Sequence, residues 1–288
     1  MSSRDPIPAA YQPTAPRQGD LGDKTEPFVS TNANTIEPSE RPEPRWGFWA
    51  TTGFSLVVLG TFLILQTVAA ILFMVVHIGV SGQAFDLADA ESLTSNGLLI
   101  SIATLVSMPP CAALVALFAK LKRGATLRGY LGLRTFSVRQ GLTWLGATVV
   151  YVAVCDGLTY VVGRPVVPEF VANAYESAVV LPVLWIALVV AAPLFEEVFF
   201  RGFMLEGFRY TRLGPWGAIL LTSLVWSAIH VQYDAFQIGG IFLGGLLLGA
   251  ARIRTGSVFL TMAMHALQNV IATVEAAVYV HLQQAAGG

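Results

Sequence analysis

Charged residues are scarce in this sequence. Only 12% of its 288 residues are Asp, Glu, Lys or Arg, against roughly 25% in a typical soluble domain. With 55% hydrophobic residues and a mean hydropathy of +0.64, this scarcity excludes an ordinary soluble globule. The formal net charge is −1, so no nucleic acid or other polyanionic partner is indicated. The composition predicts a polytopic helical membrane protein.

Cysteine is scarce too. Cys111 and Cys155 both lie in apolar runs, so the sequence predicts no disulfide framework. The HExxH motif is absent, which excludes the helix-borne zinc site of the zincin proteases. No basic start followed by an apolar segment opens the chain, so we expect no signal peptide.

Residues 1–45 differ in composition from the rest. They hold 8 of the 15 prolines and 12 of the 35 charged residues, with almost no apolar run. Such a segment buries too little apolar surface to offset the entropy lost on ordering. We therefore predict a disordered, proline-rich cytoplasmic tail over 1–45.

From Trp46 onward the sequence forms apolar blocks long enough to cross ~30 Å of hydrocarbon as helices. These blocks predict an all-α bundle of about seven transmembrane helices, three in residues 46–177 and four in residues 178–288. The predicted spans are 46–77, 97–118, 141–163, 178–208, 214–234, 238–253 and 257–280.

Arginine and lysine alternate along these segments. Five lie in the tail, none after the first span, six after the second and one after the third. Three more lie at the end of the fourth span and in the turn after it, none in the turn after the fifth, and two where the sixth span ends and turns into the seventh. Because basic residues concentrate on the cytoplasmic side, we predict a multi-pass protein of the cell membrane with a cytoplasmic N-terminus and an external C-terminus.

Ionisable side chains inside a bilayer are expensive, at roughly 2.5–3.5 kcal/mol each near its centre. The only one that we identify in the first three spans is Asp156, which we interpret as a helix-packing residue. The last four spans carry a polar set on three predicted helices: Glu196, Glu197, Arg201, His230, His265 and Asn269.

Helical spacing gives the two adjacent carboxylates different partners. Glu197 precedes Arg201 by four residues, the favourable order for an ion pair along one helix. Glu196 points about 100° away from Glu197 and is free to face another helix. Pro193 removes a backbone hydrogen bond just before the pair and predicts a kink there. The spacing thus predicts a structural Glu197 neutralised by Arg201, and a working Glu196.

This set can activate water in two ways. A carboxylate and a histidine can deprotonate a water molecule held between them, while a second histidine and an asparagine amide stabilise an oxyanion. Alternatively, Glu196, His230 and His265 could hold a zinc ion with one position open to water. Trp226, four residues before His230, can support that imidazole. From the chemistry alone, a proton or ion relay and a structural polar network remain open.

The polar set resembles the CAAX protease and bacteriocin-processing (CPBP) family of intramembrane proteases, the group that includes type II CAAX prenyl proteases and lysostaphin resistance proteins. The family pattern EExxxR is met by Glu196-Glu197-x-x-x-Arg201. FxxGxxxG is met by Phe242-x-x-Gly245-x-x-x-Gly249, and HxxxN by His265-x-x-x-Asn269. FxxxH is met with one departure, because Trp226 replaces the phenylalanine before His230. The resemblance covers about residues 178–275.

The resemblance implies an intramembrane endopeptidase with a helical protease core over 178–288. Glu196 and His230 would activate water, and His265 and Asn269 would support the oxyanion or a metal. Zinc is the cofactor implied if a metal is used, and a metal-free mechanism is the other expectation. The partners implied are the lipid bilayer and a membrane-embedded or lipid-anchored protein or peptide substrate. A catalytically silent scaffold or immunity protein and a proton-coupled transporter are the alternatives.

Overall fold

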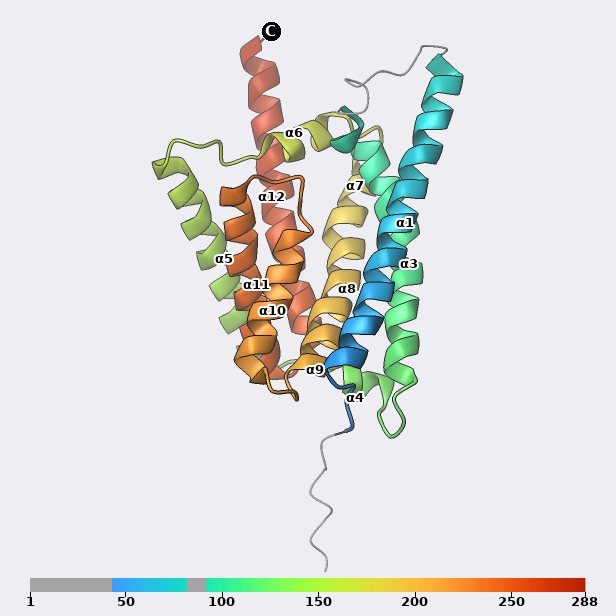
Figure 1. The fold of residues 1–288 in the computed structure, drawn as a ribbon. Helices are drawn as coiled ribbons and strands as arrows, with labels where there is room; N and C mark the ends of the chain where they lie inside the picture. The colour runs from blue at the N-terminus through green and yellow to red at the C-terminus, as the bar shows by residue number, and fades with distance from the viewer. Residues whose placement is uncertain (1–42, 82–91, 288) are drawn as a thin grey trace, which may run out of the picture. The chain divides into compact units, whose positions relative to one another are not determined.

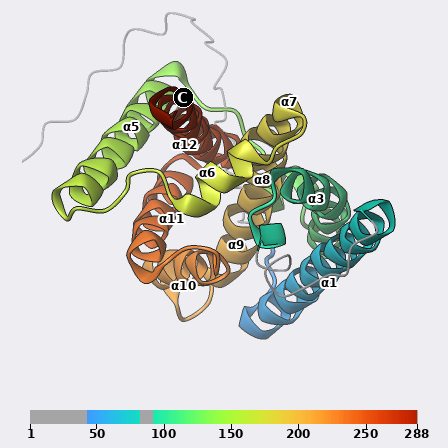
Figure 2. The ribbon, with the colours of Figure 1, turned by 90° about the horizontal axis from the view of Figure 1, so that it is seen from above.

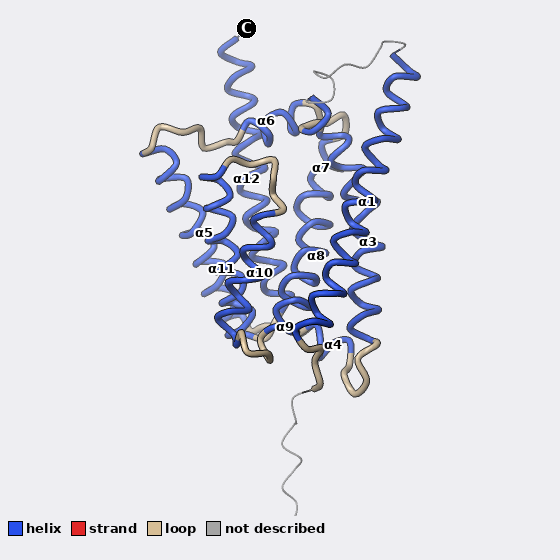
Figure 3. The backbone as a smooth tube through the Cα atoms, in the orientation of Figure 1, coloured by secondary structure: helices blue, strands red, loops and turns tan. Residues whose placement is uncertain are grey.

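The chain folds into helices. The computed structural model describes residues 43–81 and 92–287, and within them it contains helices and no strand (Figure 3). Pro42–Gly288 form one compact unit, in which the long helices run side by side (Figure 1). The all-α polytopic bundle predicted from hydropathy is therefore confirmed.

Six helical segments in the described residues are long and apolar enough to cross a membrane, which makes this a multi-pass membrane protein. Five of them are formed by, or lie within, single helices. They are α1 (Phe48–Ser81), α3 (Gly97–Lys120), α5 (Val138–Val161), α11 (Ala235–Thr255) and α12 (Val258–Gly287). The sixth, Leu181–Phe208, consists of several consecutive helical pieces.

The segment Leu181–Phe208 corresponds to the predicted fourth span. It alternates between α- and π-helix, and we call it the interrupted helix. Its pieces are α7 (Leu181–Trp185), η1 (Ile186–Ala191), α8 (Ala192–Glu196), η2 (Glu197–Met204) and α9 (Leu205–Phe208). Pro193, which has no backbone N–H to donate, lies in the first turn of α8. The predicted disturbance of the helix therefore takes the form of π-helical turns, which are wider than α-helical ones and frequent at functional sites.

The predicted fifth span, 214–234, is wrong in its extent. The helix α10 (Gly214–Ala228) ends six residues earlier, and the chain then turns through 229–234 before α11 begins. At 1.5 Å per residue its 15 residues extend only about 22 Å. His230 therefore lies in a turn beyond the helix end instead of within a membrane-spanning helix.

The interrupted helix occupies the middle of the bundle (Figure 2). Half of its most apolar 18-residue window is buried, compared with 6% in α1 and 11% in α5. Its buried face is aromatic, with Phe195, Phe199, Phe200 and Phe203 packed in the main core. The exposed apolar faces of α1 and α5 suit contact with lipid.

Two short helices and an ordered N-terminal segment were not predicted. They are α4 (Leu127–Leu131), α6 (Glu169–Glu176) and the segment Glu43–Arg45. The prediction placed this segment in the disordered tail, yet the Arg45 side chain is only 9% exposed and pairs with Glu206. The ordered chain therefore begins before residue 46. Residues 1–42, the rest of the predicted tail, lie outside the described residues.

Candidate active site

Glu197 is held by two partners on neighbouring elements. One guanidinium nitrogen of Arg201 lies 2.9 Å from Glu197 Oε1, and His265 Nδ1 lies 3.0 Å from the same oxygen. Glu197 and Arg201 are fully buried. Because an ionised carboxylate only accepts hydrogen bonds, His265 donates through Nδ1. The pair expected from spacing thus forms, and it also fixes η2 against α12.

Glu196 has a different environment from its neighbour. Its carboxylate is half-buried, and Oε2 accepts a hydrogen bond of 2.5 Å from the indole Nε1 of Trp226 on α10. Oε1 accepts no hydrogen bond from any side chain or backbone group in the described residues. One oxygen of this carboxylate is therefore fixed and the other is available to a ligand or water.

Trp226 is the centre of the site. Besides bonding Glu196, it makes a cation–π contact with Arg201, whose guanidinium carbon lies 4.4 Å from the ring centroid. The imidazoles of His230 and His265 each approach it edge to face with centroids 5.3 Å apart. The indole brings one carboxylate and both histidines around a single side chain.

His230 is oriented by the backbone of α10. Its Nδ1 lies 2.7 Å from the carbonyl oxygen of Trp226. Since a carbonyl only accepts hydrogen bonds, Nδ1 carries the proton and Nε2 of the neutral ring keeps its lone pair. The ring can thus accept a proton on the side that faces away from the helix backbone.

Tyr233 is a candidate that the sequence reasoning missed. Its ring stacks on His230 at 6.2 Å, and Phe170 of α6 packs edge-on against it at 5.6 Å. Burial, and then the nearby negative charge of Glu196, raise the pKa of Tyr233 to about 12. The phenol therefore stays protonated close to Glu196. Its only sequence signal was a position three residues after His230.

The turn that carries His230 and Tyr233 is anchored at its far end. Asp234 begins α11 by accepting hydrogen bonds from the backbone N–H groups of Phe236 and Gln237, at 2.8 and 2.9 Å. Arg164, from the loop after α5, adds an ion pair of 2.5 Å. The backbone N–H of Gln237 and then Arg164 hold the pKa of Asp234 below its usual range. Cap and ion pair together fix where the turn joins α11.

Asn269 contacts the backbone of the interrupted helix. Its Nδ2 donates to the carbonyl oxygen of Leu188 in η1 at 2.7 Å. That carbonyl lacks the usual helical donors, because Ala192 N–H bonds Ala187 and Pro193 has no N–H. Asn269 thus satisfies the carbonyl and keeps a second amide hydrogen for another acceptor. The oxyanion contact expected from the sequence stays a prediction.

The glycines of the FxxGxxxG motif let α11 approach α10. A methyl group added at Gly245 would lie 2.8 Å from Ser223 Cβ, and one at Gly249 would lie 2.9 Å from a methyl carbon of Ile219. Carbon atoms do not approach so closely without displacing one another. Gly245 also offers its carbonyl oxygen to Arg201 at 3.4 Å. These two glycines therefore have a packing role.

The candidate zinc ligands are engaged in other contacts. Glu196 bonds Trp226, His230 bonds a backbone carbonyl, and His265 bonds Glu197. Across residues 43–81 and 92–287, no three His, Cys, Asp or Glu side chains lie close enough together to hold a metal ion. The arrangement therefore does not match the ligand set expected for zinc, and the use of a metal stays a prediction.

A family model matches the part of the chain that carries the motifs. Residues 178–271 match the family described as type II CAAX prenyl endopeptidase Rce1-like. This region is an Rce1-like domain. The match spans the interrupted helix, α10, α11 and the start of α12, and it confirms the family expected from the motifs.

One relative extends the likeness without naming an activity. An uncharacterized 24.3 kDa protein of Escherichia coli is 36% identical over 136 residues, which is 43% of this chain and 59% of that protein. The chain thus spans less than two thirds of that relative's length. No solved structure matches this chain.

Proposed function

We propose that this protein is an intramembrane endopeptidase that hydrolyses a peptide bond in a membrane-associated protein or peptide. One observation carries the proposal. Of two adjacent carboxylates, Glu197 is fully buried and paired with Arg201 and His265, while Glu196 is half-buried with one oxygen unengaged. A carboxylate that is held in place but not neutralised suits a general base.

In this mechanism Glu196 activates the nucleophile. A water molecule hydrogen-bonded to Glu196 Oε1 transfers a proton to the carboxylate. At the same time the water oxygen attacks the carbonyl carbon of the scissile bond. His230, with the lone pair of Nε2 available, is the second group that can accept this proton. When the carbon–nitrogen bond breaks, the proton passes to the leaving amine, which regenerates the free base.

The negative charge that forms on the carbonyl oxygen needs hydrogen-bond donors. His265 can donate one through Nε2 in the doubly protonated form of the ring, in which both nitrogens carry a hydrogen. Asn269 has one amide hydrogen left, and Tyr233 has its phenol. Donors aimed at an oxyanion in a water-poor site contribute strongly to catalysis, roughly 10²–10³-fold each.

We expect the substrate to be a membrane-embedded or lipid-anchored protein or peptide. Glu196 lies within a helical segment that is long and apolar enough to cross the bilayer, and the Rce1-like domain belongs to a family of prenyl endopeptidases by its description. A polypeptide that enters from the lipid phase would reach such a site most directly. The non-motif regions give no reason to favour a prenylated CAAX protein over another membrane or leader peptide.

The test compares new protein N-termini in native membranes that contain the wild type or Glu196→Gln at equal abundance. We expect peptide ends that occur with the wild type and not with the variant, which identifies the substrate as well. The matched control is Glu275→Gln, the same change at another half-buried glutamate, on α12, and it should leave those ends unchanged. Full cleavage by a folded Glu196→Gln would contradict the proposal.

A chelator separates the two ways of activating water. In the mechanism proposed here no step passes through a metal, so cleavage by the purified protein should persist after treatment with 1,10-phenanthroline. Loss of cleavage that added zinc restores would replace this mechanism with the zinc alternative through Glu196, His230 and His265.

A further inference from the structure

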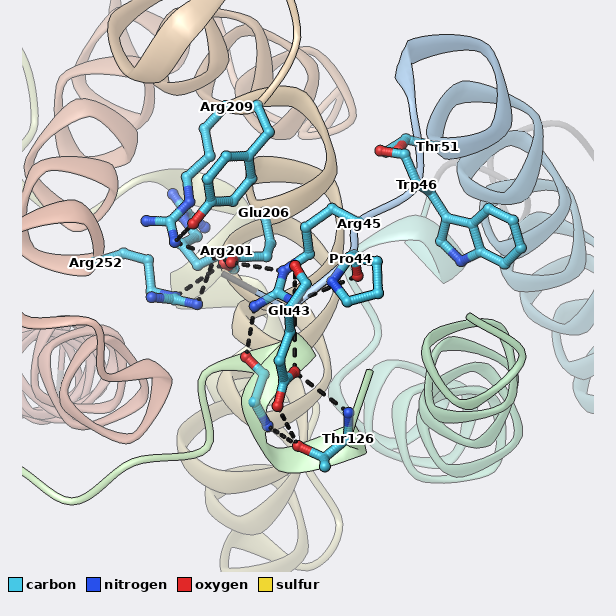
Figure 4. A network of polar contacts seen from close by, with 12 residues as sticks. Glu43, Pro44, Arg45, Trp46, Thr51, Thr126, Arg201, Glu206, Arg209 and Arg252 are labelled. Carbon is cyan, nitrogen blue, oxygen red and sulfur yellow. Dashed lines mark hydrogen bonds and ion pairs between the residues drawn. The ribbon is translucent and has the colours of Figure 1, made fainter. Parts of the chain in front are cut away.

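A second buried charge cluster lies on the same interrupted helix, at its far end. The carboxylate of Glu206, only 1% exposed, is surrounded by three arginines (Figure 4). The ion-pair distances are 2.8 Å to Arg45, 2.9 Å to Arg209 and 3.1 Å to Arg252. The Glu206 carboxylate faces three guanidinium groups, and a second carboxylate, that of Glu43, lies 3.4 Å from Arg45. The guanidinium groups still need further acceptors.

Two of the arginines find these acceptors on separate elements. Arg45 donates to the carbonyl oxygen of Gly129 in α4 at 3.0 Å and stacks over Tyr130 at 5.0 Å. Arg252 donates through Nε to the carbonyl oxygen of Arg201 at 3.2 Å. This last bond joins the Glu206 cluster to the turn of helix that carries the Glu197–Arg201 pair.

The bond from Arg252 reaches the helix where its hydrogen-bond register changes. In η2 the N–H of Leu205 bonds the carbonyl of Phe200, five residues earlier, and α9 then continues from Leu205. A return of η2 to α-helical bonding would rotate the side chains on either side of the change relative to one another, by about 100° per residue of shift. A side chain that holds a carbonyl at this point therefore helps to fix the direction of Glu196 and Glu197.

We propose that Arg252, linked through Glu206 to Arg45, is a positioning residue that holds the catalytic helix in its π-helical register. The proposal rests on the proposed function for the meaning of "catalytic helix", and the structural part stands on the contacts alone. Through Arg45, the segment Glu43–Trp46 becomes part of the same support, because Glu43 bonds Thr126 at 2.8 Å and Trp46 bonds the carbonyl of Phe118 at 2.9 Å.

The first test compares Arg252→Lys with Arg209→Lys in the full-length protein in lipid nanodiscs. Both variants keep a positive charge beside Glu206, but only Arg252 also bonds the backbone of Arg201. With the peptide substrate found in the N-terminus comparison, we expect kcat to fall about tenfold in Arg252→Lys, with KM within about twofold; tenfold corresponds to about 1.4 kcal/mol. Arg209→Lys should stay within about twofold in both. Equal losses in the two variants would overturn the proposal.

The second test needs no cleavage. Hydrogen–deuterium exchange of the segment 197–208 should be faster in Arg252→Lys, and nearly unchanged in Arg209→Lys. Because this measurement does not use a substrate, it gives a result even if Glu196→Gln disproves the proposed function. Unchanged exchange in Arg252→Lys would overturn the positioning role. If that variant does not accumulate, Arg252→Gln takes its place with the same expectation.

The third test concerns the N-terminal segment. Arg45→Gln removes the guanidinium that joins Glu206 to α4, and we expect faster exchange in the segment 197–208 here too. Unchanged exchange would remove Glu43–Trp46 from the proposed support.

Discussion

Two buried charge clusters occupy the interrupted helix, and they differ in how completely their groups are paired. At Glu197 one arginine and one histidine face a carboxylate, with a second, partly free carboxylate next to it. At Glu206 three arginines surround one carboxylate, whose two oxygens are both engaged. Burial of charge is common to both. What distinguishes the candidate active site is Glu196, which Trp226 holds in place and which forms no ion pair of its own within the described residues.

The largest effect should come from removing Glu197. Glu197→Ala leaves Arg201 fully buried without its ion-pair partner, and we expect the free energy of unfolding to fall by about 3–5 kcal/mol. Chemical denaturation in detergent micelles measures it. The double variant Glu197→Ala/Arg201→Met should recover part of the loss, since no charge is then left buried alone. A fall of less than about 1 kcal/mol in Glu197→Ala would contradict a structural role.

Removing the charge of Glu206 should have a somewhat smaller effect. In Glu206→Gln we expect the free energy of unfolding to fall by roughly 2–4 kcal/mol, because Arg209 is 20% exposed and keeps some hydration. Folded protein should still cleave, at a reduced rate, in contrast to Glu196→Gln. The same denaturation measurement, with a cleavage assay on the folded fraction, checks both parts. A folded but wholly inactive Glu206→Gln would erase the distinction between the clusters.

Trp226→Phe tests the hydrogen bond that the Trp226 indole gives to Glu196. Phenylalanine, the residue of the family motif, keeps an aromatic ring and therefore most of the packing. It lacks the indole N–H and cannot give this hydrogen bond. Hydrogen bonds to charged groups contribute roughly 1.5–3 kcal/mol, so kcat/KM should fall by about tenfold or more. A kcat/KM of Trp226→Phe equal to that of the wild type would show that this hydrogen bond contributes nothing to the reaction.

The smallest effect concerns the exposed turn between α10 and α11. The depressed pKa of Asp234 means that the ionised cap stabilises the turn above the ordinary Asp pKa of about 3.8. This stabilisation is lost as the pH falls through the lower, folded-state pKa. Hydrogen exchange in the first turn of α11 should therefore lose protection only at acid pH. Asp234→Asn keeps a capping oxygen and should remove this pH dependence.

Long helices could be predicted from the sequence because an apolar segment in a bilayer must satisfy its backbone hydrogen bonds internally. The end of α10 was missed because no glycine or proline follows Ala228 before Gly239, and apolar residues still recur through Tyr233. A signal was nevertheless present, since Asp234 and Gln237 form a capping box, and a helix that starts there requires a break before it.

The site divides in the same way. Spacing along one helix was enough to pair Glu197 with Arg201, because residues four apart lie on the same face. It could not show that His265 joins this pair, that Trp226 bonds Glu196, or that Asn269 satisfies a carbonyl near Pro193. These contacts connect helices, and helix rotation is decided by packing.

The sequence by itself determined the class of protein, most of the helix bounds and the membership of the polar set, because these depend on composition and on residues near one another in the chain. Only the tertiary structure decided that Trp226 bonds Glu196, that His265 joins Glu197, and that Arg45, Glu206 and Arg252 meet. Arg45 and Glu206 are 161 residues apart, and Glu206 and Arg252 are 46 apart. From sequence, basic residues near the ends of membrane spans are interpreted as water-exposed topology signals. Only the packing shows that Arg252 is buried instead.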